Sequence, residues 1–123
     1  KALRNEETIW YAPDHDYGRK NAVFVPFFAV PDACTTTGSY YLLKSSPNSK
    51  VIPFVPLRNK DGSGYTVSIS APVDFTDLQD ETEIAARMNQ IVEKEIMKGI
   101  SQYMWLHRRF KTRPDENTPS LYD

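Results

Sequence analysis

The sequence predicts one mixed α/β domain, from two kinds of periodicity and from the order in which they occur. "DETEIAARMNQIVEKEIMKG" (80–99) repeats its apolar residues at helical spacing. "YTVSISA" (65–71) alternates apolar and hydroxyl side chains, as a strand with one buried face does. Strand-like and helix-like segments alternate along the chain, which is typical of α/β layers. The 123 residues, 40% hydrophobic and 25% charged, suit a single domain spanning 1–123.

The first third of the chain is predicted to contain two extended segments and a short helix. "TIWYA" (8–12) is apolar and is followed by Pro13, so we expect a buried strand there. "AVFVPFFAV" (22–30) is a continuous apolar run that suits an extended segment or part of a lid. "CTTTGSYYLLKSS" (34–46) offers threonine caps before apolar residues, which predicts a helix starting near Thr36.

A hairpin is predicted in the middle of the chain. "KVIPFVPLRN" (50–59) suits a strand, and its two prolines favour an edge or irregular strand because proline donates no ladder hydrogen bond. "NKDGSG" (59–64) is a turn. In the strand at 65–71 the apolar side chains are expected to face the core and the hydroxyls to face water; the apolar set is Tyr65, Val67, Ile69 and Ala71.

The helix at 80–99 is the clearest element. Asp80 and Glu83 have capping-box spacing, and Gly99 is placed to end the helix. One side carries a stripe that should pack on the sheet. It consists of Ile84, Met88, Ile91, Val92, Glu95 and Ile96.

Charge and cysteine content exclude several classes of protein. The net charge is −1, but residues 102–114 carry +4, so the remainder carries −5. The overall charge and the lack of a known motif argue against nucleic acid as a partner. A single cysteine, Cys34, excludes an internal disulfide and a multi-cysteine metal site. We expect it to be a small buried residue, and we expect no metal and no cofactor.

Asp14-His15-Asp16 follows directly on the first predicted strand. In open α/β sheets, ligands collect outside the carboxyl ends of strands. Two carboxylates flanking an imidazole could orient a proton-transfer group or hold a cation. The alternative is an Asx-type turn with a solvated histidine. No Gly-x-Ser-x-Gly elbow accompanies the triplet, and neither histidine begins a His-x-x-x-x-acid motif.

The stretch Thr35-Thr36-Thr37-Gly38 would place hydroxyls and free backbone N–H groups at a helix start, which suits either an anion site or plain capping. The basic segment "QYMWLHRRFKTRP" (102–114) has three interpretations. It could be a solvated surface stripe, a contact with an anionic membrane surface, or a nucleic-acid contact. Its fixed charges are Arg108, Arg109, Lys111 and Arg113.

Five segments stand out by their mixed chemistry: "WYAPDHDYG" (10–18), "FVPFFAVPDACTTTG" (24–38), "VIPFVPLR" (51–58), "DGSGY" (61–65) and "SQYMWLHRRFKTRP" (101–114). Together they resemble the C-terminal part of one enzyme family, the late acyltransferases of bacterial lipid A biosynthesis. The resemblance covers essentially the whole chain in the family's order. Three further stretches are similar to the cold-induced, palmitoleoyl-transferring branch, with the lauroyl-transferring branch as the alternative. They are "GRKN", the run from Lys50 to Ser70, and "DENTPSLYD".

The resemblance implies the C-terminal portion of a glycerolipid-acyltransferase-like mixed sheet with flanking helices. It also implies transfer of a fatty acyl chain from acyl carrier protein to a Kdo-bearing lipid A precursor at the cytoplasmic face of the inner membrane. The family's histidine general base and its acid are absent here, as is its N-terminal membrane anchor. We therefore expect a C-terminal fragment without activity of its own. The alternative is a non-catalytic module that binds anionic lipid or an acidic partner protein.

The same resemblance implies roles for residues of this chain. Asp14, His15 and Asp16 would lie beside the substrate and orient arginines or the upstream catalytic pair, and Thr36 and Thr37 would line the same cleft. The basic side chains would meet the phosphates and carboxylates of the lipid A precursor, because guanidinium forks fit both groups. They are Arg108, Arg109, Lys111 and Arg113. Acidic acyl carrier protein and anionic lipid remain alternative contacts for the same segment.

Overall fold

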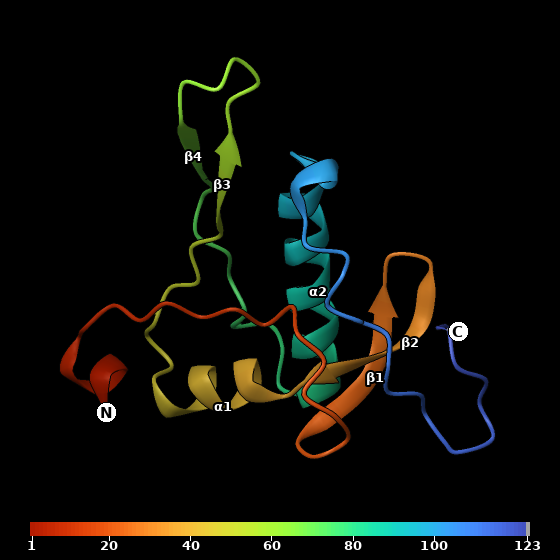
Figure 1. The fold of residues 1–123 in the computed structure, drawn as a ribbon. Coiled ribbons are helices and arrows are strands. Elements are labelled where there is room, and N and C mark those ends of the chain that lie inside the picture. The colour runs from red at the N-terminus through yellow and green to blue at the C-terminus, as the bar shows by residue number, and fades with distance from the viewer. Residues whose placement is uncertain (123) are drawn as a thin grey trace.

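The computed structural model describes residues 1–122 and confirms an α/β fold (Figure 1). Its strands pair as two separate antiparallel hairpins. The elements in chain order are the 3-10 helix η1 (Ala2–Asn5), β1 (Ala22–Phe27), β2 (Val30–Thr36), α1 (Gly38–Ser45), β3 (Phe54–Arg58), β4 (Tyr65–Ile69), α2 (Glu81–Met97) and the 3-10 helix η2 (Ile100–Gln102).

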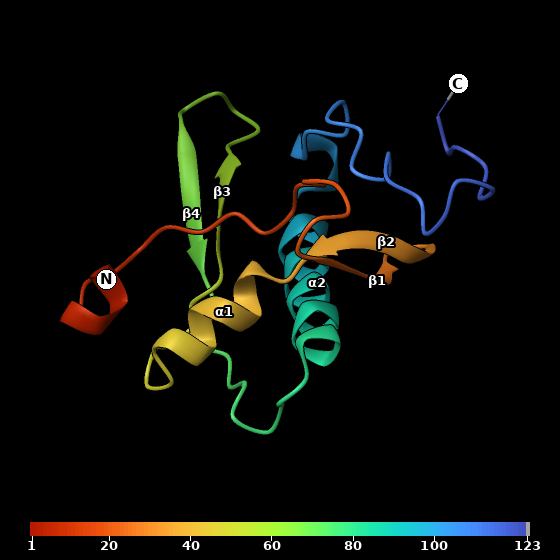
Figure 2. The same ribbon diagram turned by 90° about the horizontal axis from the view of Figure 1, so that it is seen from below.

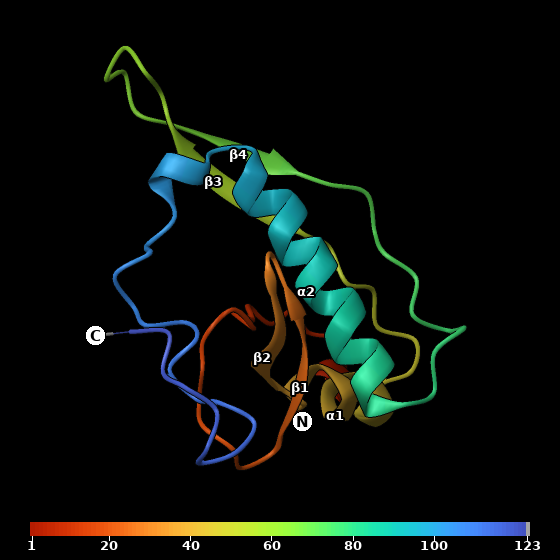
Figure 3. The same cartoon turned by 90° about the vertical axis from the view of Figure 1, so that its right-hand side faces the viewer.

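The β1–β2 hairpin carries the main core. The apolar run at 22–30 forms β1, which confirms the extended segment, and the chain reverses between Phe27 and Val30. Phe27 and Ala33 are fully buried and pack with Ile96 of α2. Burying a phenylalanine side chain stabilises a fold by about 1.5–3 kcal/mol. Figures 2 and 3 show α2 lying along this hairpin.

Helix α2 forms where its capping and periodicity predict. Asp80 caps it by accepting hydrogen bonds from the backbone N–H groups of Thr82 (2.8 Å) and Glu83 (3.2 Å). The buried side of α2 holds the predicted stripe at Ile84, Met88 and Ile96, with Ile91 and Val92 half-buried. Ile84 and Met88 form a second core cluster with Phe75 from the loop before the helix.

Two expectations for the N-terminal half were wrong. Residues 8–12 form no strand, and Trp10 is 76% exposed, because no strand among residues 1–122 lies beside the segment to complete a ladder. The helix expected near Thr36 begins at Gly38, because Cys34 to Thr36 pair with β1 instead. A side chain at Gly38 would meet the Tyr11 hydroxyl at 2.8 Å, so glycine suits this close approach.

The β3–β4 hairpin forms as predicted but with its faces reversed. Tyr65, Val67 and Ile69 are exposed, whereas the hydroxyl side faces α2. Lys98 Nζ donates to Ser68 Oγ at 3.1 Å and to Ser70 Oγ at 2.9 Å, which accounts for this orientation. The hairpin projects beside the C-terminal end of α2 (Figure 1). Among residues 1–122, no helix is long and apolar enough to cross a membrane.

Candidate functional site

The Asp14–Asp16 turn and the basic segment meet in the fold, although some 90 residues separate them. The rings of His15 and His107 stack with their centroids 4.6 Å apart. Asp16 and Thr112 are hydrogen-bonded. We call this region the motif junction, and it consists of Asp14, His15, Asp16, Tyr103, His107 and Thr112. The structure thus brings into contact two segments that the sequence had marked separately as candidate binding residues.

Asp16 holds the C-terminal segment in place. Its carboxylate accepts hydrogen bonds from the Thr112 backbone N–H (2.8 Å), the Thr112 hydroxyl (2.9 Å) and the Gly18 backbone N–H (2.9 Å). The residue is 7% exposed. Because these bonds occupy the carboxylate, Asp16 positions the chain and makes no ion pair with an arginine in the part of the chain described. Gly18 has φ +85°, so this turn requires the left-handed conformation that glycine adopts freely.

Arg109 lies inside the fold. Its buried position does not fit the expectation that it contacts the head group of the lipid A precursor. It is 2% exposed, and its Nη1 donates to the Cys34 carbonyl at 2.7 Å. Its guanidinium carbon lies 4.6 Å from the centroid of the Phe27 ring, an arrangement typical of cation–π contacts. Burial lowers the pKa of the guanidinium. Arg109 therefore fastens the basic segment to β2, and a ligand cannot reach it.

A buried polar network continues from Arg109 into α2. Arg109 Nη2 donates to Thr35 Oγ1 at 3.2 Å, and Asn89 Nδ2 donates to the same oxygen at 2.9 Å. Asn89 also donates to the Pro26 carbonyl at 2.8 Å. The sequence marked Thr35 only as part of a possible anion site, and sequence reasoning missed Asn89. The only signal was an asparagine on the apolar side of a helix, where a buried amide must find partners.

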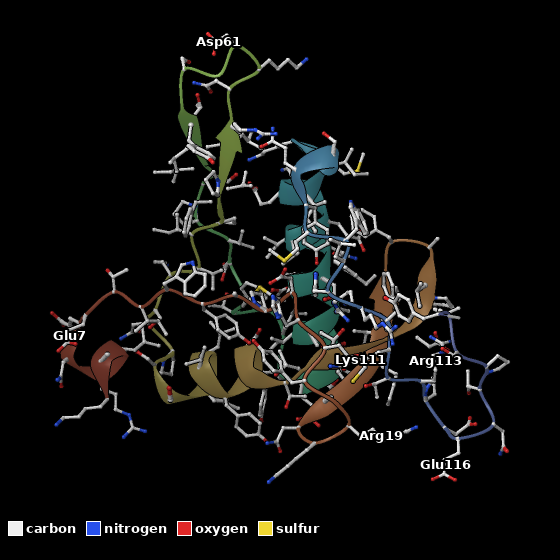
Figure 4. All side chains as sticks on the ribbon, viewed as in Figure 1. Glu7, Arg19, Asp61, Lys111, Arg113 and Glu116 are labelled. Carbon is white, nitrogen blue, oxygen red and sulfur yellow. The ribbon has the colours of Figure 1, made fainter. Side chains whose placement is uncertain are left out.

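The other three cations divide between the interior and the surface. Arg113 pairs with Asp32 at 3.0 Å, and both side chains are largely covered. Arg108 is exposed, with its guanidinium 5.7 Å from the centroid of the Tyr122 ring. Lys111 is exposed as well, and Figure 4 labels it on the C-terminal segment near β1 and β2. Arg108 and Lys111 are thus the two cations of this segment that remain free to meet an anionic partner.

Arg19 extends the basic surface. Its Nη1 donates to the Pro114 carbonyl at 2.5 Å, so the 13–21 loop lies against the end of the basic segment. The guanidinium also lies 5.9 Å from the centroid of the Phe24 ring. Figure 4 labels Arg19, Lys111 and Arg113 in the same part of the molecule. Sequence reasoning missed Arg19, because a single arginine in a polar loop carries no distinguishing pattern.

Asp14, His15 and His107 are the only groups among residues 1–122 whose ligand atoms could converge on a cation. These atoms lie within 4.8 Å of one another. The histidine rings stack with an interplanar angle of only 22°, so their in-plane lone pairs do not point at a common centre. His107 Nε2 lies 3.3 Å from the Tyr103 hydroxyl, and its Nδ1 contacts the Met104 carbonyl. We assign no metal to this arrangement.

Tyr103 completes the junction as a neutral hydrogen-bonding group. Burial, together with the nearby Asp14 carboxylate, raises the pKa of the Tyr103 phenol. The hydroxyl therefore stays protonated near neutral pH. Asp14 has no ion-pair partner among the residues described, so its carboxylate and the exposed His15 are the accessible groups of the junction.

The threonine residues and Cys34 serve internal contacts. Thr37 is buried, and its hydroxyl donates to the Asn21 carbonyl at 3.0 Å. Thr36 Oγ1 accepts from the Gly38 backbone N–H at 3.1 Å, a local contact in the turn that leads into α1. Cys34 is buried as predicted, and its thiol donates to the Gly18 carbonyl at 3.4 Å. Burial, reinforced by nearby Asp16, raises the Cys34 pKa to about 11, so it is no nucleophile at neutral pH.

Comparison with known proteins identifies the family. A family model described as bacterial lipid A biosynthesis acyltransferase matches residues 1–112. A lipid A biosynthesis acyltransferase of Haemophilus influenzae is 93% identical over 123 residues, which is the whole chain and 40% of that relative. The lipid A biosynthesis lauroyltransferase of Escherichia coli is 53% identical over 122 residues, 99% of the chain and 39% of the relative.

A third relative is named for palmitoleoyl transfer, the activity of the branch that the sequence comparison favoured. The lipid A biosynthesis palmitoleoyltransferase of Escherichia coli is 47% identical over 113 residues, 92% of the chain and 36% of the relative. The chain thus spans about two-fifths of the length of the curated relatives it matches. It belongs to the family of bacterial lipid A biosynthesis acyltransferases.

Proposed function

We propose that the protein is the C-terminal portion of an enzyme that moves a fatty acyl chain from acyl carrier protein to the lipid A precursor Kdo2-lipid IV(A). The observation that carries this proposal is the family match over residues 1–112. The reaction would occur at the cytoplasmic face of the inner membrane. A histidine and an acid outside this chain would activate the acceptor hydroxyl, which attacks the thioester carbon and releases the carrier thiol.

The basic segment beside the motif junction would contribute contacts to the anionic acceptor. Phosphates and sugar carboxylates favour arginine and lysine as partners. Arg108 and Lys111 are exposed, whereas Arg109 and Arg113 already bond within the chain. We therefore assign the acceptor contacts to Arg108 and Lys111, and the positioning of the segment to Arg109. The acidic acyl carrier protein is the competing partner for the same two cations.

Two acyl chains are candidates for the transferred group. The three stretches that resemble the palmitoleoyl-transferring branch favour palmitoleoyl transfer. The higher identity, 53% against 47%, is to the lauroyltransferase rather than the palmitoleoyltransferase. The two candidates predict different added masses on the same acceptor, so lipid mass distinguishes them directly.

The test is mass spectrometry of lipid A from cells that lack this acyl transfer and are complemented with the full-length acyltransferase carrying this segment. Addition of a C16:1 chain would support palmitoleoyl transfer. Addition of a C12 chain would keep the enzyme and replace the acyl group. No added chain from a folded, membrane-located protein would overturn the proposal. The 123-residue chain, expressed separately, is expected to add nothing.

A binding module for anionic lipid is the second candidate function. Leu106 is 94% exposed and Met104 is 68% exposed, and the cation Arg108 lies two residues after Leu106. Apolar side chains beside cations are typical of segments that lie on anionic membranes. This candidate predicts that the protein binds vesicles containing anionic lipid and that Leu106→Asp releases it without loss of folding.

A further inference from the structure

The outer face of the β3–β4 hairpin is apolar and uncovered. Residues opposite each other in an antiparallel pair point to the same side, so Phe54 and Ile69 share a face with the Pro56–Val67 pair. Ile69 is 69% exposed, Val67 54% and Phe54 48%. Alternating apolar residues normally face a core. In the residues described, nothing covers this face.

Hydrogen bonds at both ends of the hairpin fix which backbone groups point away from it. Asn59 N–H donates to the Gly64 carbonyl at 2.8 Å, and Ser70 N–H donates to the Pro53 carbonyl at 2.9 Å. Residues bonded across an antiparallel pair alternate with residues whose N–H and C=O groups point outward. Tyr65, Val67 and Ile69 fall in the outward set. The exposed side chains and the free backbone groups of β4 therefore belong to the same residues.

The two edges of the hairpin differ. The β3 edge is closed, because Pro56 has no N–H and the Gln102 side chain bonds both backbone groups of Arg58, at 2.7 Å and 3.2 Å. The β4 edge, "YTVSI", contains no proline and no lysine. Native proteins usually protect a free edge with such residues, since an unprotected edge pairs with other strands.

The length of the relatives indicates what would cover the hairpin face. The relatives are about two and a half times as long as this chain, so most of each relative lies outside the matched segment. The outer face of the hairpin carries one cation, Arg58, and no acid, which favours an apolar protein segment over a charged partner.

We propose that the free edge of β4 receives an additional strand from the part of the full-length acyltransferase outside this chain, and that the same part covers Phe54, Val67 and Ile69. The added strand would bond the outward groups of Tyr65, Val67 and Ile69 and extend the hairpin into a larger sheet. Its own side chains would alternate, with apolar residues on the side of Val67. This inference rests on family membership and on the length of the relatives, and it does not depend on which acyl chain is transferred.

Amide hydrogen exchange in the full-length protein, resolved residue by residue, tests the proposal with internal references. Thr66 and Ser68 bond inside the hairpin, and Asp61 lies in its turn. We expect Val67 and Ile69 to exchange as slowly as Thr66 and Ser68, at least about 100-fold more slowly than Asp61. A period-two pattern, with residues 66 and 68 slow and residues 65, 67 and 69 fast, would overturn the added strand.

The source of any protection is assigned by two further conditions. Protection of Val67 that is independent of protein concentration and of the detergent used supports the intrachain strand. Protection that disappears on dilution would mean that a second copy pairs with the edge, and protection that requires lipid would mean membrane contact; either result overturns the proposal. Lipid A mass spectrometry is a separate readout, so failure of the acyl-transfer proposal would leave this result interpretable.

Paired variants keep the test valid if one of them folds poorly. Val67→Pro removes an outward N–H and is tolerated at a free edge, whereas Thr66→Pro removes a bond within the hairpin itself. In the full-length protein we expect both variants to lower the thermal midpoint. If Val67→Pro leaves the midpoint unchanged while Thr66→Pro lowers it, the edge is free. The thermal midpoints of Val67→Lys and Thr66→Lys in the full-length protein make the same comparison for the outer face of the hairpin.

Discussion

The motif junction and the β3–β4 hairpin show two opposite ways of placing polar and apolar groups. At the junction and directly beside it, the charged groups Asp16 and Arg109 are buried and bonded within the chain. On the hairpin, Val67 and Ile69 are exposed, and the backbone groups of Tyr65, Val67 and Ile69 face outward without partners among residues 1–122. The first region is complete within this chain, whereas the second presents a surface suited to a further element.

This difference shows that burial in the chain separates positioning residues from contact residues. A cation such as Arg109, which is buried and bonds within the chain through Nη1 and Nη2, would act on function only through the placement of its neighbours. A cation such as Lys111, which is exposed, can meet a ligand directly. The same logic assigns the apolar face of the hairpin to packing against another part of the protein.

Replacing a phenylalanine by alanine beside the junction and on the hairpin should give the largest difference in stability between the two regions. Phe27 is 0% exposed and lies under Arg109, so Phe27→Ala should destabilise the 123-residue chain by about 3–5 kcal/mol. Phe54→Ala, at an exposed site, should cost less than about 1 kcal/mol. Urea unfolding of both variants measures the difference. Equal losses would mean that the outer hairpin face is already covered in this chain.

Asp16→Asn tests the anchoring of the basic segment. The amide nitrogen cannot accept the hydrogen bond from the Thr112 N–H or hydroxyl, so one of these donors loses its partner. We expect a loss of about 2 kcal/mol, because hydrogen bonds to charged groups are among the stronger ones. Thermal unfolding gives the value, with Glu116→Gln on the exposed C-terminal segment as the matched control. An unchanged midpoint would remove Asp16 from the account of the junction.

Glu95 connects α2 to the end of the hairpin strand and predicts a pH dependence. It accepts a hydrogen bond from Ser70 Oγ at 2.8 Å and pairs with Lys98 at 2.6 Å. Burial opposes ionisation, but Lys98 and Ser70 outweigh it and lower the pKa of the Glu95 carboxyl below its ordinary 4.5. The stabilisation is therefore fully present above pH 4.5 and is lost as the pH falls through the lower folded value.

The variant for this prediction is Glu95→Gln. We expect it to cost about 1 kcal/mol at pH 7 and nothing at a pH below the folded pKa. Denaturant midpoints taken across the acid range give the profile. A variant whose loss is the same at every pH would show that the carboxylate charge contributes nothing.

Lys111 should give the smallest effect on stability. Because it is exposed and makes no ion pair among the described residues, Lys111→Ala should change the free energy of unfolding by less than about 0.5 kcal/mol. Affinity for the anionic acceptor should fall about fivefold, equivalent to one cation near anionic lipid. Vesicle or acceptor binding measures this effect. Unchanged affinity would point away from Lys111 as a contact.

Local rules predicted much of the fold. The Asp80 cap and the stripe from Ile84 to Ile96 depend on neighbours within one helix, so sequence periodicity was sufficient. The prediction of a strand at residues 8–12 was wrong because a strand needs a partner, and the placement of a partner is not a local property of the sequence. The faces of β4 reversed because Lys98 draws Ser68 and Ser70 toward α2, a contact across 28 to 30 residues.

The sequence named many residues of the candidate site, but it did not predict which of them are buried and which are exposed. Asp16 contacts Thr112 of the basic segment, but it does not pair with the arginines that the sequence suggested it would orient. The sequence could not show that Arg109 is buried while Lys111 is exposed, because both lie in one basic run. Burial depends on how the segment lies over Phe27 and β2, and only the tertiary packing determines it.

The most direct test of the account is steady-state acyl transfer by the full-length enzyme carrying Asp14→Ala, with Asp61→Ala at the hairpin tip as the matched loss of a carboxylate (Figure 4). The account predicts a drop of at least about tenfold in kcat for Asp14→Ala with an unchanged thermal midpoint, because Asp14 would orient the arginines or the catalytic pair, and it predicts normal transfer for Asp61→Ala. Normal turnover by Asp14→Ala would contradict the assignment of the motif junction to the acceptor side of the reaction.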